Sequence, residues 1–550
     1  MFSPDLSLYL NLGNITTIGG GQAFNPYYLV PVPSHGTGYL KFRSETILFR
    51  ALTRLLFNKM APALFIWNLF WWGLLCVIAL RLFRRWLPPA SGYFAVSGLC
   101  LLMLFNFGVI KPLLSAWLHL PSLSGFQNFE LPFMRPFVPQ VPIVLLLAYL
   151  GLQIAVLRNS NIASWMAMWL LQFSALTVFP FSTLMMVGIT LVSALWALFF
   201  AGWPRAWRSF LTYAVACGVS DVGFLKFGSL NLYGSRAPAI HFQPQLLPHL
   251  IGLAWLFLFV LVLLVAFNSA LAPEVKWPLV GLGAASLLLM PGDAFVPAPV
   301  LLLSTHAGYF THTTDVILCT FIAPNLLAGM RTHFVTRVAI GILSGLLLLD
   351  GIFTSVATYK VFAPFNREVA DASHLLSSLA PEGRELFIAP STYVVNLAGW
   401  IVLLPRQPVL FCTDAALMLT PEQLREVAWP REALYLYFSG EDSSHLERAI
   451  VGKDFLKTTF ALGFRAEATS LSREEQLDAV RTIRADLIPK LQEVEAHSAT
   501  VTQFLAQFER IVVIDNSENR SFSPTRLASY LRLESEQRLN NLILQSYVPR

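Results

Sequence analysis

Residues 61–357 consist mainly of long apolar runs that are separated by polar connections. A helix needs about 20 mainly apolar residues to cross the ~30 Å hydrocarbon core of a bilayer. We therefore expect about ten transmembrane helices, of which the sixth and the eighth are the weakest. The runs lie at residues 61–83, 92–110, 141–157, 163–178, 183–203, 210–224, 250–267, 277–290, 315–330 and 335–357.

The segment 1–60 precedes the first of these runs and is too polar to be a membrane span itself. Its last part alternates leucine and isoleucine with Arg50 and Arg54 at helical spacing. An amphipathic helix with cations on one face lies flat at a membrane surface. We expect such an interfacial helix to lead directly into the first span.

Arginine and lysine in the short connections predict the orientation of the chain. Alternate connections carry these cations: Arg81, Arg84 and Arg85; Arg158; Arg205 and Arg208; Lys276; Arg331 and Arg337. Cytoplasmic loops of membrane proteins carry an excess of lysine and arginine. The transmembrane region 61–357 should therefore place its long loops 111–140, 225–249 and 291–314 on the outer face, together with both ends of the chain.

After Lys360 the pattern changes to that of a soluble α/β domain, which we assign to residues 358–550. Short β-rich runs occur at residues 385–389, 408–412, 433–438 and 510–515. A long helix is expected from Ser472, which forms a capping box with Glu475, to about Glu509. The predicted fold is thus a polytopic α-helical membrane protein with a C-terminal soluble α/β domain on the extracytoplasmic side, built on a small sheet of unresolved topology.

Composition supports the membrane assignment and argues against nucleic acid as a partner. The chain is 55% hydrophobic and only 13% charged, whereas an average soluble domain has about 25% charged residues. Its net charge of +6 comes mostly from helix ends and from the C-terminal region, not from a basic patch on a folded face. The five cysteines show no disulfide or zinc-binding spacing.

The outer loop after Met290 carries the first candidate site, formed by Asp293, His306, His312 and Asp315. Two histidines and two acids are ligand types that a divalent metal ion such as Mg²⁺ or Mn²⁺ can use. The spacing of the histidines matches no helical metal motif. The alternative interpretation is that these histidines contact the membrane interface or an acceptor molecule. The sequence therefore establishes no cofactor.

Further polar groups have simpler interpretations. Asp350 lies within the last predicted span, where it would serve as a proton relay if the chain were a transporter. Ser439, Asp442 and His445 are close in sequence, but no pattern orients them as a catalytic triad. Asp5 precedes a short Leu-Ser-Leu-Tyr segment and could act as a helix N-cap.

Three features together resemble the start of bacterial membrane glycosyltransferases of the GT-C class. They are the acid Asp5, the sequence Asn25-Pro26-Tyr27, and the amphipathic helix at 42–60 that runs into a span. The Arg/Pro-rich stretch 132–140 is similar to an outer segment of uncharacterised members of that class, and residues 386–411 resemble the start of their external domain. The motifs that carry the resemblance are short, and they are spread over most of the chain.

This resemblance implies transfer of a sugar from a polyprenyl-phosphate carrier to an envelope acceptor, at the outer face of the bacterial inner membrane. The family's acid in the first loop is a catalytic base or lies next to a metal, and it corresponds to Asp5. Among outer-side cations that could hold the carrier phosphate (Lys111, Arg135, Lys226 and Arg236), Arg135 is the first choice. An arginine can bind two phosphate oxygens at once, although Arg135 could also only extend from a span end to the headgroups.

One departure from the family pattern affects the functional prediction. Members of the class begin with a span ahead of the acid, whereas only four residues precede Asp5 here. We expect that the start has been placed too late; the alternative is the loss of that helix and, with it, of activity. A non-catalytic subunit of a complex with other membrane proteins remains the second hypothesis, and a transporter the third.

Overall fold

A computed structural model of the chain describes most of its helices and strands. The described residues are 24–25, 30–31, 44–56, 60–87, 92–104, 140–159, 162–202, most of 207–218, 252–294, 303–328, single residues between 338 and 356, most of 367–376, 384–391, 397–398, 408–412, 423–452 and 473–550. For some helical residues, among them 303–309 and 473–484, only the backbone is described.

The N-terminal part of the described chain forms a bundle of apolar helices. They are α4 (Met60–Trp86), α5 (Gly92–Leu104), α7 (Gln140–Arg158), α8 (Ile162–Val178), α9 (Pro180–Phe200), α12 (Leu253–Phe267), α13 (Pro273–Leu289) and α14 (Leu303–Ala328). Among described residues, the segments Pro62–Trp86, Gln140–Arg158 and Phe181–Phe200 are long and apolar enough to span a membrane. Shorter apolar helical segments lie at Phe94–Met103, Ile162–Leu176 and Ala254–Phe267.

These helices confirm a helical, polytopic membrane protein. Each described helix of the bundle overlaps one of the apolar runs in the sequence. The expected number of about ten crossings stays a prediction, because most of runs 210–224 and 335–357 lies outside the described residues.

Glycines allow α9 and α13 to pack closely. A Cβ atom on Gly281 of α13 would lie 2.7 Å from the Cα atom of Ile189 on α9, and one on Gly188 would lie 2.5 Å from the Cβ atom of Ala285. Small residues at such contacts let helix backbones approach, which strengthens packing in a membrane where no hydrophobic effect drives association. The pair α9 and α13 therefore forms a fixed centre, against which α12 and α14 also pack.

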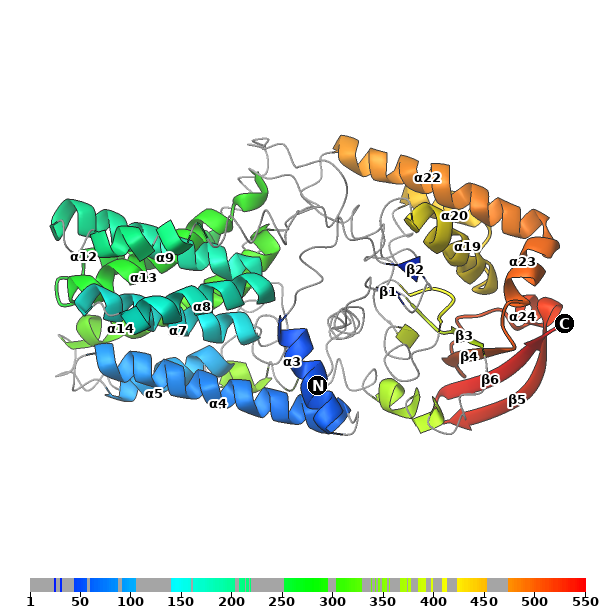
Figure 1. The fold of residues 1–550 in the computed structure, drawn as a ribbon, viewed down its shortest axis with the longest axis horizontal. Helices are drawn as coiled ribbons and strands as arrows, with labels where there is room; N and C mark the ends of the chain where they lie inside the picture. Colours follow the sequence, from blue (N-terminus) through cyan, green and yellow to red (C-terminus); the bar gives the residue numbers. More distant parts are fainter. Residues whose placement is uncertain are drawn as a thin grey trace.

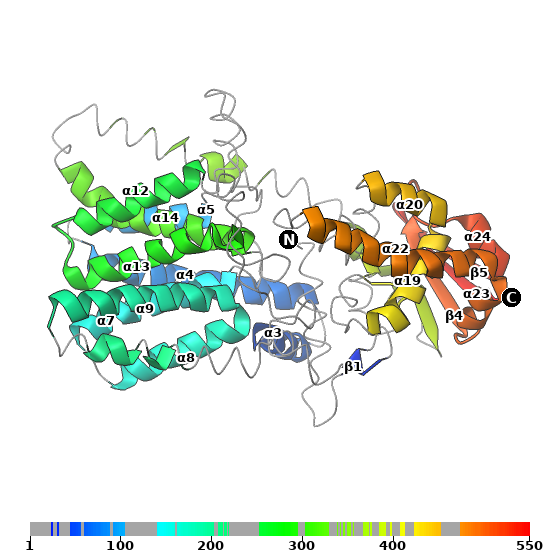
Figure 2. The same ribbon diagram turned by 90° about the horizontal axis from the view of Figure 1, so that it is seen from above.

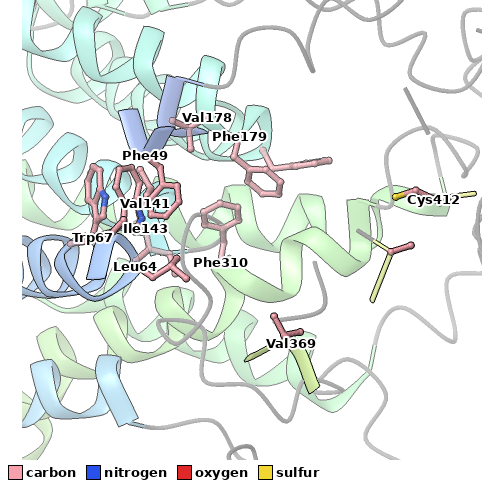
Figure 3. Packing of buried hydrophobic residues seen from close by; sticks show 14 of the residues in the cluster. Phe49, Leu64, Trp67, Val141, Ile143, Val178, Phe179, Phe310, Val369 and Cys412 are labelled. Carbon is pink, nitrogen blue, oxygen red and sulfur yellow. The ribbon is translucent and has the colours of Figure 1, made fainter. Parts of the chain in front are cut away.

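The helix α3 (Ser44–Leu55) is the amphipathic helix expected before the first span. It packs against α4 and α8, and its buried Phe49 meets Trp67 of α4 edge to face at 5.6 Å between ring centroids. Leu48 and Leu55 on the same helix are exposed. Figure 3 shows this junction, with Val178, Phe179 and Phe310 close to Phe49 and Val141.

The bundle has two distinct ends. The α3 end holds the start of α4, and Figures 1 and 2 show the sheet and its helices beyond this end. The short antiparallel pair β1 (Phe24–Asn25) and β2 (Val30–Pro31) lies on that side as well. At the opposite end, Arg158 of α7 lies 4.4 Å from the Trp86 ring of α4, so the last residues of α4 and α7 lie together.

The C-terminal part is built on a four-stranded sheet of order β3-β4-β6-β5. Its strands are β3 (Glu385–Ile388), β4 (Arg510–Asn516), β5 (Leu531–Leu539) and β6 (Leu542–Pro549). Strand β3 runs parallel to β4, while β6 is antiparallel to both β4 and β5. Val409 forms an isolated parallel bridge with Phe387 of β3. Strands β3 and β4 are buried along most of their length, whereas β5, at the other end of the order, forms a polar, exposed edge.

Helices pack around this sheet and correct two sequence-based predictions. They are the π-helical turn η6 (Leu424–Ala428), α19 (Trp429–Phe438), α20 (Ser443–Gly452), α22 (Arg473–Ala496), α23 (Ser498–Leu505) and α24 (Pro524–Tyr530). The strand predicted at 433–438 is wrong, since these residues belong to α19. The single helix expected up to Glu509 is divided at His497 into α22 and α23.

Candidate functional site in helix α14

Helix α14 contains a polar segment of five consecutive residues in the interior of the bundle. Thr311, His312, Thr313, Thr314 and Asp315 are all buried, and the most exposed of them, His312, is only 6% exposed. Successive helical residues are about 100° apart, so five of them point to every side of the helix. The segment is therefore enclosed by its neighbours α5, α12 and α13 instead of facing lipid on one side.

One side of the segment is tied to α13. The hydroxyl groups of Thr314 and Ser286 share a hydrogen bond of 2.9 Å, and the Ser286 hydroxyl also lies 3.7 Å from the Met185 sulfur of α9. Nearby, Phe310 of α14 packs against Phe179 with 6.1 Å between ring centroids. These contacts fix the rotation of α14 about its axis and hence the position of Asp315, which follows Thr314.

Asp315 is the unusual member of the segment. Both of its carboxylate oxygens are buried, and neither has a hydrogen-bond partner among the residues that the structure describes. An acidic side chain inside a membrane helix is costly and marks a functional site by default. His312 lies three residues before Asp315, on the same face of the helix. This pair is the described part of the site that the sequence predicted.

The other two predicted members of this site lie nearby along the backbone. His306 is in the first turn of α14, and Asp293 is in the short 3-10 helix η5 (Gly292–Ala294), which packs against α14. Their side chains are outside the described residues. The helix begins well before Asp315, so the segment predicted as the end of the loop 291–314 is helical from Leu303 onwards.

The described side chains do not test the prediction of a metal ion at this site. Among them, no group of three or more histidine, cysteine, aspartate or glutamate residues could hold a metal ion. Asp315 and His312 alone offer a carboxylate and an imidazole, which suit Mg²⁺ or Mn²⁺ only with further ligands. The proposed metal therefore depends on Asp293 and His306.

The remaining predicted site residues fall outside the described residues. They are Asp5, Lys111, Arg135 and Arg236. Asp350, the candidate proton relay, is described and buried. Its role stays a prediction.

A second buried polar network crosses α7 and α9, and sequence reasoning missed it. The hydroxyl of Tyr149 on α7 lies 2.6 Å from that of Thr190 on α9, and Thr190 also donates to Gln153 at 3.5 Å. All three side chains are buried. Only their polarity within apolar runs could have indicated them, and tyrosine and threonine are too common in spans for that signal to be specific.

In the C-terminal part, the structure gives Ser439, Asp442 and His445 separate local contacts. Asp442 accepts hydrogen bonds from the Ser444 hydroxyl at 2.7 Å and from the His445 amide at 2.6 Å, so it caps the start of α20. The His445 ring pairs with Glu441, and the Ser439 hydroxyl donates to the Tyr435 carbonyl at 2.9 Å. The three side chains therefore do not form a triad.

Buried titratable groups do gather under α19. The Tyr435 hydroxyl accepts a hydrogen bond of 3.0 Å from the Ser391 amide, and burial raises the pKa of this tyrosine to about 12. Burial likewise raises the pKa of Glu432 to about 8. Asp515 at the end of β4 binds the amides of Asn516, Ser521 and Phe522, which partly offset the upward effect of burial on its pKa. Tyr435 and Asp515 thereby hold the backbone at Ser391 and at Ser521 and Phe522.

Comparisons with known proteins add little to this geometry. No protein-family model matches the chain, and no curated protein matches it. The solved structures that it matches include the crystal structure of ArnT from Cupriavidus metallidurans in the apo state. That match covers 98% of this chain and 96% of the other, at 13% sequence identity and a TM-score of 0.35. Values this low do not show a shared fold.

Proposed function

We propose that this chain is a glycosyltransferase of the bacterial cytoplasmic membrane. It would transfer a sugar from a polyprenyl-phosphate carrier to an acceptor in the cell envelope, at the outer face. The observation that carries the proposal is Asp315, a buried carboxylate without a described partner, placed inside a polar segment of a membrane helix. A reaction site provides a reason to keep such a group in spite of its cost.

The two ends of the bundle support the outer location. Arg84 and Arg85 end α4, Arg158 ends α7, and the ring contact with Trp86 brings these two helix ends together. Such a gathering of arginines favours the cytoplasmic side. The C-terminal part lies beyond the opposite end (Figures 1 and 2), where it would roof an outward-facing site.

The chemistry assigns a role to each proposed residue. The acceptor oxygen attacks the anomeric carbon of the sugar, its proton passes to the Asp5 carboxylate, and the bond from that carbon to the carrier phosphate breaks. Arg135, with Lys111 and Arg236, would hold the phosphate as its negative charge increases. Asp315 and His312 would bind acceptor hydroxyl groups, since a carboxylate in a site shielded from water accepts strong hydrogen bonds.

The test compares envelope glycans and glycolipids in cells that carry different versions of the gene. Cells that lack the gene should lose or truncate one glycan, and the wild-type gene should restore it. Asp5→Ala, Arg135→Ala and Asp315→Asn should each fail to restore it at wild-type protein levels. Glu518→Gln is the matched control, because it also removes one charge, from an exposed loop of the soluble part.

Other outcomes would favour the alternatives. If all three variants restore the glycan profile, the enzyme assignment with these residues is wrong. If loss of the gene changes no glycan and the protein co-purifies stoichiometrically with other membrane proteins, the chain is a non-catalytic subunit. A transporter would instead show uptake or export of a solute that depends on Asp350.

A further inference from the structure

Four arginines gather at the end of the bundle that lies away from the sheet. Arg81, Arg84 and Arg85 come from the last two turns of α4, and Arg158 is the last residue of α7. All four side chains are exposed. We call these four arginines, together with Trp86, the arginine–tryptophan cluster.

The indole of Trp86 holds two of these guanidinium groups. The Cζ atom of Arg158 lies 4.4 Å from the ring centroid, and that of Arg85 lies 5.0 Å from it. Both distances are within the range of a cation–π interaction. A guanidinium group that packs on a ring uses its flat face, and the N–H donors along its edge stay available for an anion. The ring thus orders two forked donors around one indole.

The charge of the cluster has no counterpart in the described protein. Among the residues that the structure describes, no carboxylate forms an ion pair or a hydrogen bond with any of the four arginines. Arg81 and Arg85 are four residues apart on one helix, where like charges repel. An external anion bound between these cations would lower this repulsion.

The cluster lies at the level of the membrane surface. Leu157, next to Arg158, packs with Trp196 of α9 and Trp277 of α13. Tryptophan side chains gather where the hydrocarbon core meets the headgroups. The phosphate groups of lipids lie at this depth, and basic pockets between transmembrane helices bind anionic headgroups there.

We infer that the arginine–tryptophan cluster binds the phosphate group of an anionic membrane lipid. The headgroup phosphate accepts hydrogen bonds from the edges of Arg85 and Arg158, while Arg81 and Arg84 add to the attraction. The lipid would join the ends of α4 and α7 at the face away from the soluble part. This inference does not depend on the proposed sugar transfer, because the residues and the membrane face are different.

The first experiment measures lipid binding to the full-length protein in detergent by native mass spectrometry. Phosphatidylglycerol should bind more tightly than zwitterionic phosphatidylcholine. Arg158→Gln should weaken the binding of phosphatidylglycerol about fivefold, and the double variant Arg85→Gln/Arg158→Gln about 25-fold, since each substitution removes a direct hydrogen bond to the phosphate that contributes about 1 kcal/mol. The inference is wrong if the double variant binds phosphatidylglycerol as tightly as the wild type.

Arg208→Gln is the control for a general loss of charge. Arg208 is also exposed and described, and it lies soon after the end of α9 at the same end of the bundle, without a described aromatic partner. Its variant should bind phosphatidylglycerol like the wild type. An equal loss of affinity in Arg208→Gln and Arg158→Gln would show attraction to the whole basic face and would overturn a specific site.

A second arm separates a lipid from a free phosphate ion. Inorganic phosphate is added at increasing concentration to the complex with phosphatidylglycerol. A lipid site keeps its ligand, since the acyl chains also contact α4 and α7. Displacement of phosphatidylglycerol at millimolar phosphate would overturn the lipid assignment in favour of a soluble anion. Equal melting temperatures for the variants and the wild type without lipid would confirm that folding is intact.

Discussion

At the scale of single residues, we expect Asp315 to serve function at a cost in stability. A buried charge without a partner destabilises a fold, and active sites commonly retain such groups. We expect Asp315→Asn to raise the free energy of unfolding on the order of 1 kcal/mol while it abolishes function. Thermal unfolding of the full-length protein in detergent measures the first effect.

A neighbouring threonine provides the opposite control for that prediction. Thr314→Val keeps the shape of the side chain but removes the hydrogen bond to Ser286. It should lower the free energy of unfolding by about 1 kcal/mol. If Asp315→Asn destabilised the protein as Thr314→Val does, Asp315 would be a structural residue with a partner in the folded chain.

Glu432 predicts how the stability of the C-terminal part depends on pH. Burial raises its pKa from 4.5 to about 8, so the folded state holds a proton that the unfolded state releases. The contribution of Glu432 to stability is then fully present below pH 4.5 and is lost as the pH rises towards 8. The free energy of unfolding falls by at most about 1.4 kcal/mol for each pH unit in this window. Hydrogen exchange of the α19 amides, corrected for the intrinsic effect of pH, reports this fall.

The matched variants for this prediction are Glu432→Gln and Glu518→Gln. Glutamine at 432 cannot ionise and should remove the pH dependence across this window. The same change at the exposed Glu518 should leave it as in the wild type. An unchanged pH dependence in Glu432→Gln would assign the effect to another group.

Part of this residue-scale detail could be read from the sequence. Asp315 and His312 were predicted as part of a group of two histidines and two acids in the loop after Met290, and the structure places both in one helical segment. Thr314 and Ser286 were not selected, because threonine and serine satisfy themselves within a helix and carry no specific signal. Their pairing depends on which helices become neighbours, and that is set by packing far along the chain.

At the scale of elements, the contact of α9 with α13 is the most constrained. A Cβ atom at Gly281 would meet backbone atoms, with the Ile189 oxygen at 3.0 Å and the Gly188 oxygen at 3.1 Å. Gly281→Ala should therefore push the helices apart and lower the free energy of unfolding by about 1–3 kcal/mol. The melting temperature in detergent measures this loss.

Gly73 of α4 offers the control, since a Cβ atom there meets nothing within 4 Å. Gly73→Ala should be neutral or slightly stabilising, because alanine favours a helix over glycine by up to about 1 kcal/mol. Equal melting temperatures for the two variants would contradict the close contact.

The elements also show where local sequence patterns are ambiguous. Residues 433–438 read Ala-Leu-Tyr-Leu-Tyr-Phe, and such a short apolar run fits a strand or a buried helix equally well. The helix forms because Pro430 starts α19 and because nearly every side of it is buried. The hairpin of β5 and β6 escaped prediction because β5 is exposed along most of its length and shows no apolar alternation. Asn540, with a φ of 51°, marks its turn.

At the scale of the whole molecule, the arginine–tryptophan cluster and the sheet lie at opposite ends of the bundle (Figures 1 and 2). This arrangement predicts that they lie on opposite sides of the membrane. Cysteine labelling in intact cells tests it in a background without native cysteines, of which the described Cys412 is buried in any case. Glu518→Cys in the C-terminal part should react with a maleimide that cannot cross the membrane. Asn159→Cys, next to Arg158, should react only after the membrane is opened. The reverse pattern would exclude sugar transfer at the outer face.

The polar segment of α14 has a consequence for how the protein is made. An aspartate near the middle of a helix opposes membrane insertion by about 2.5–3.5 kcal/mol, and an emerging α14 must carry four more polar residues beside it. Alone at the translocon, this helix would partition poorly into lipid. Because α13 precedes it in the chain, Ser286 is already made when Thr314 emerges and can pair with it, which offsets part of the insertion cost of the polar segment.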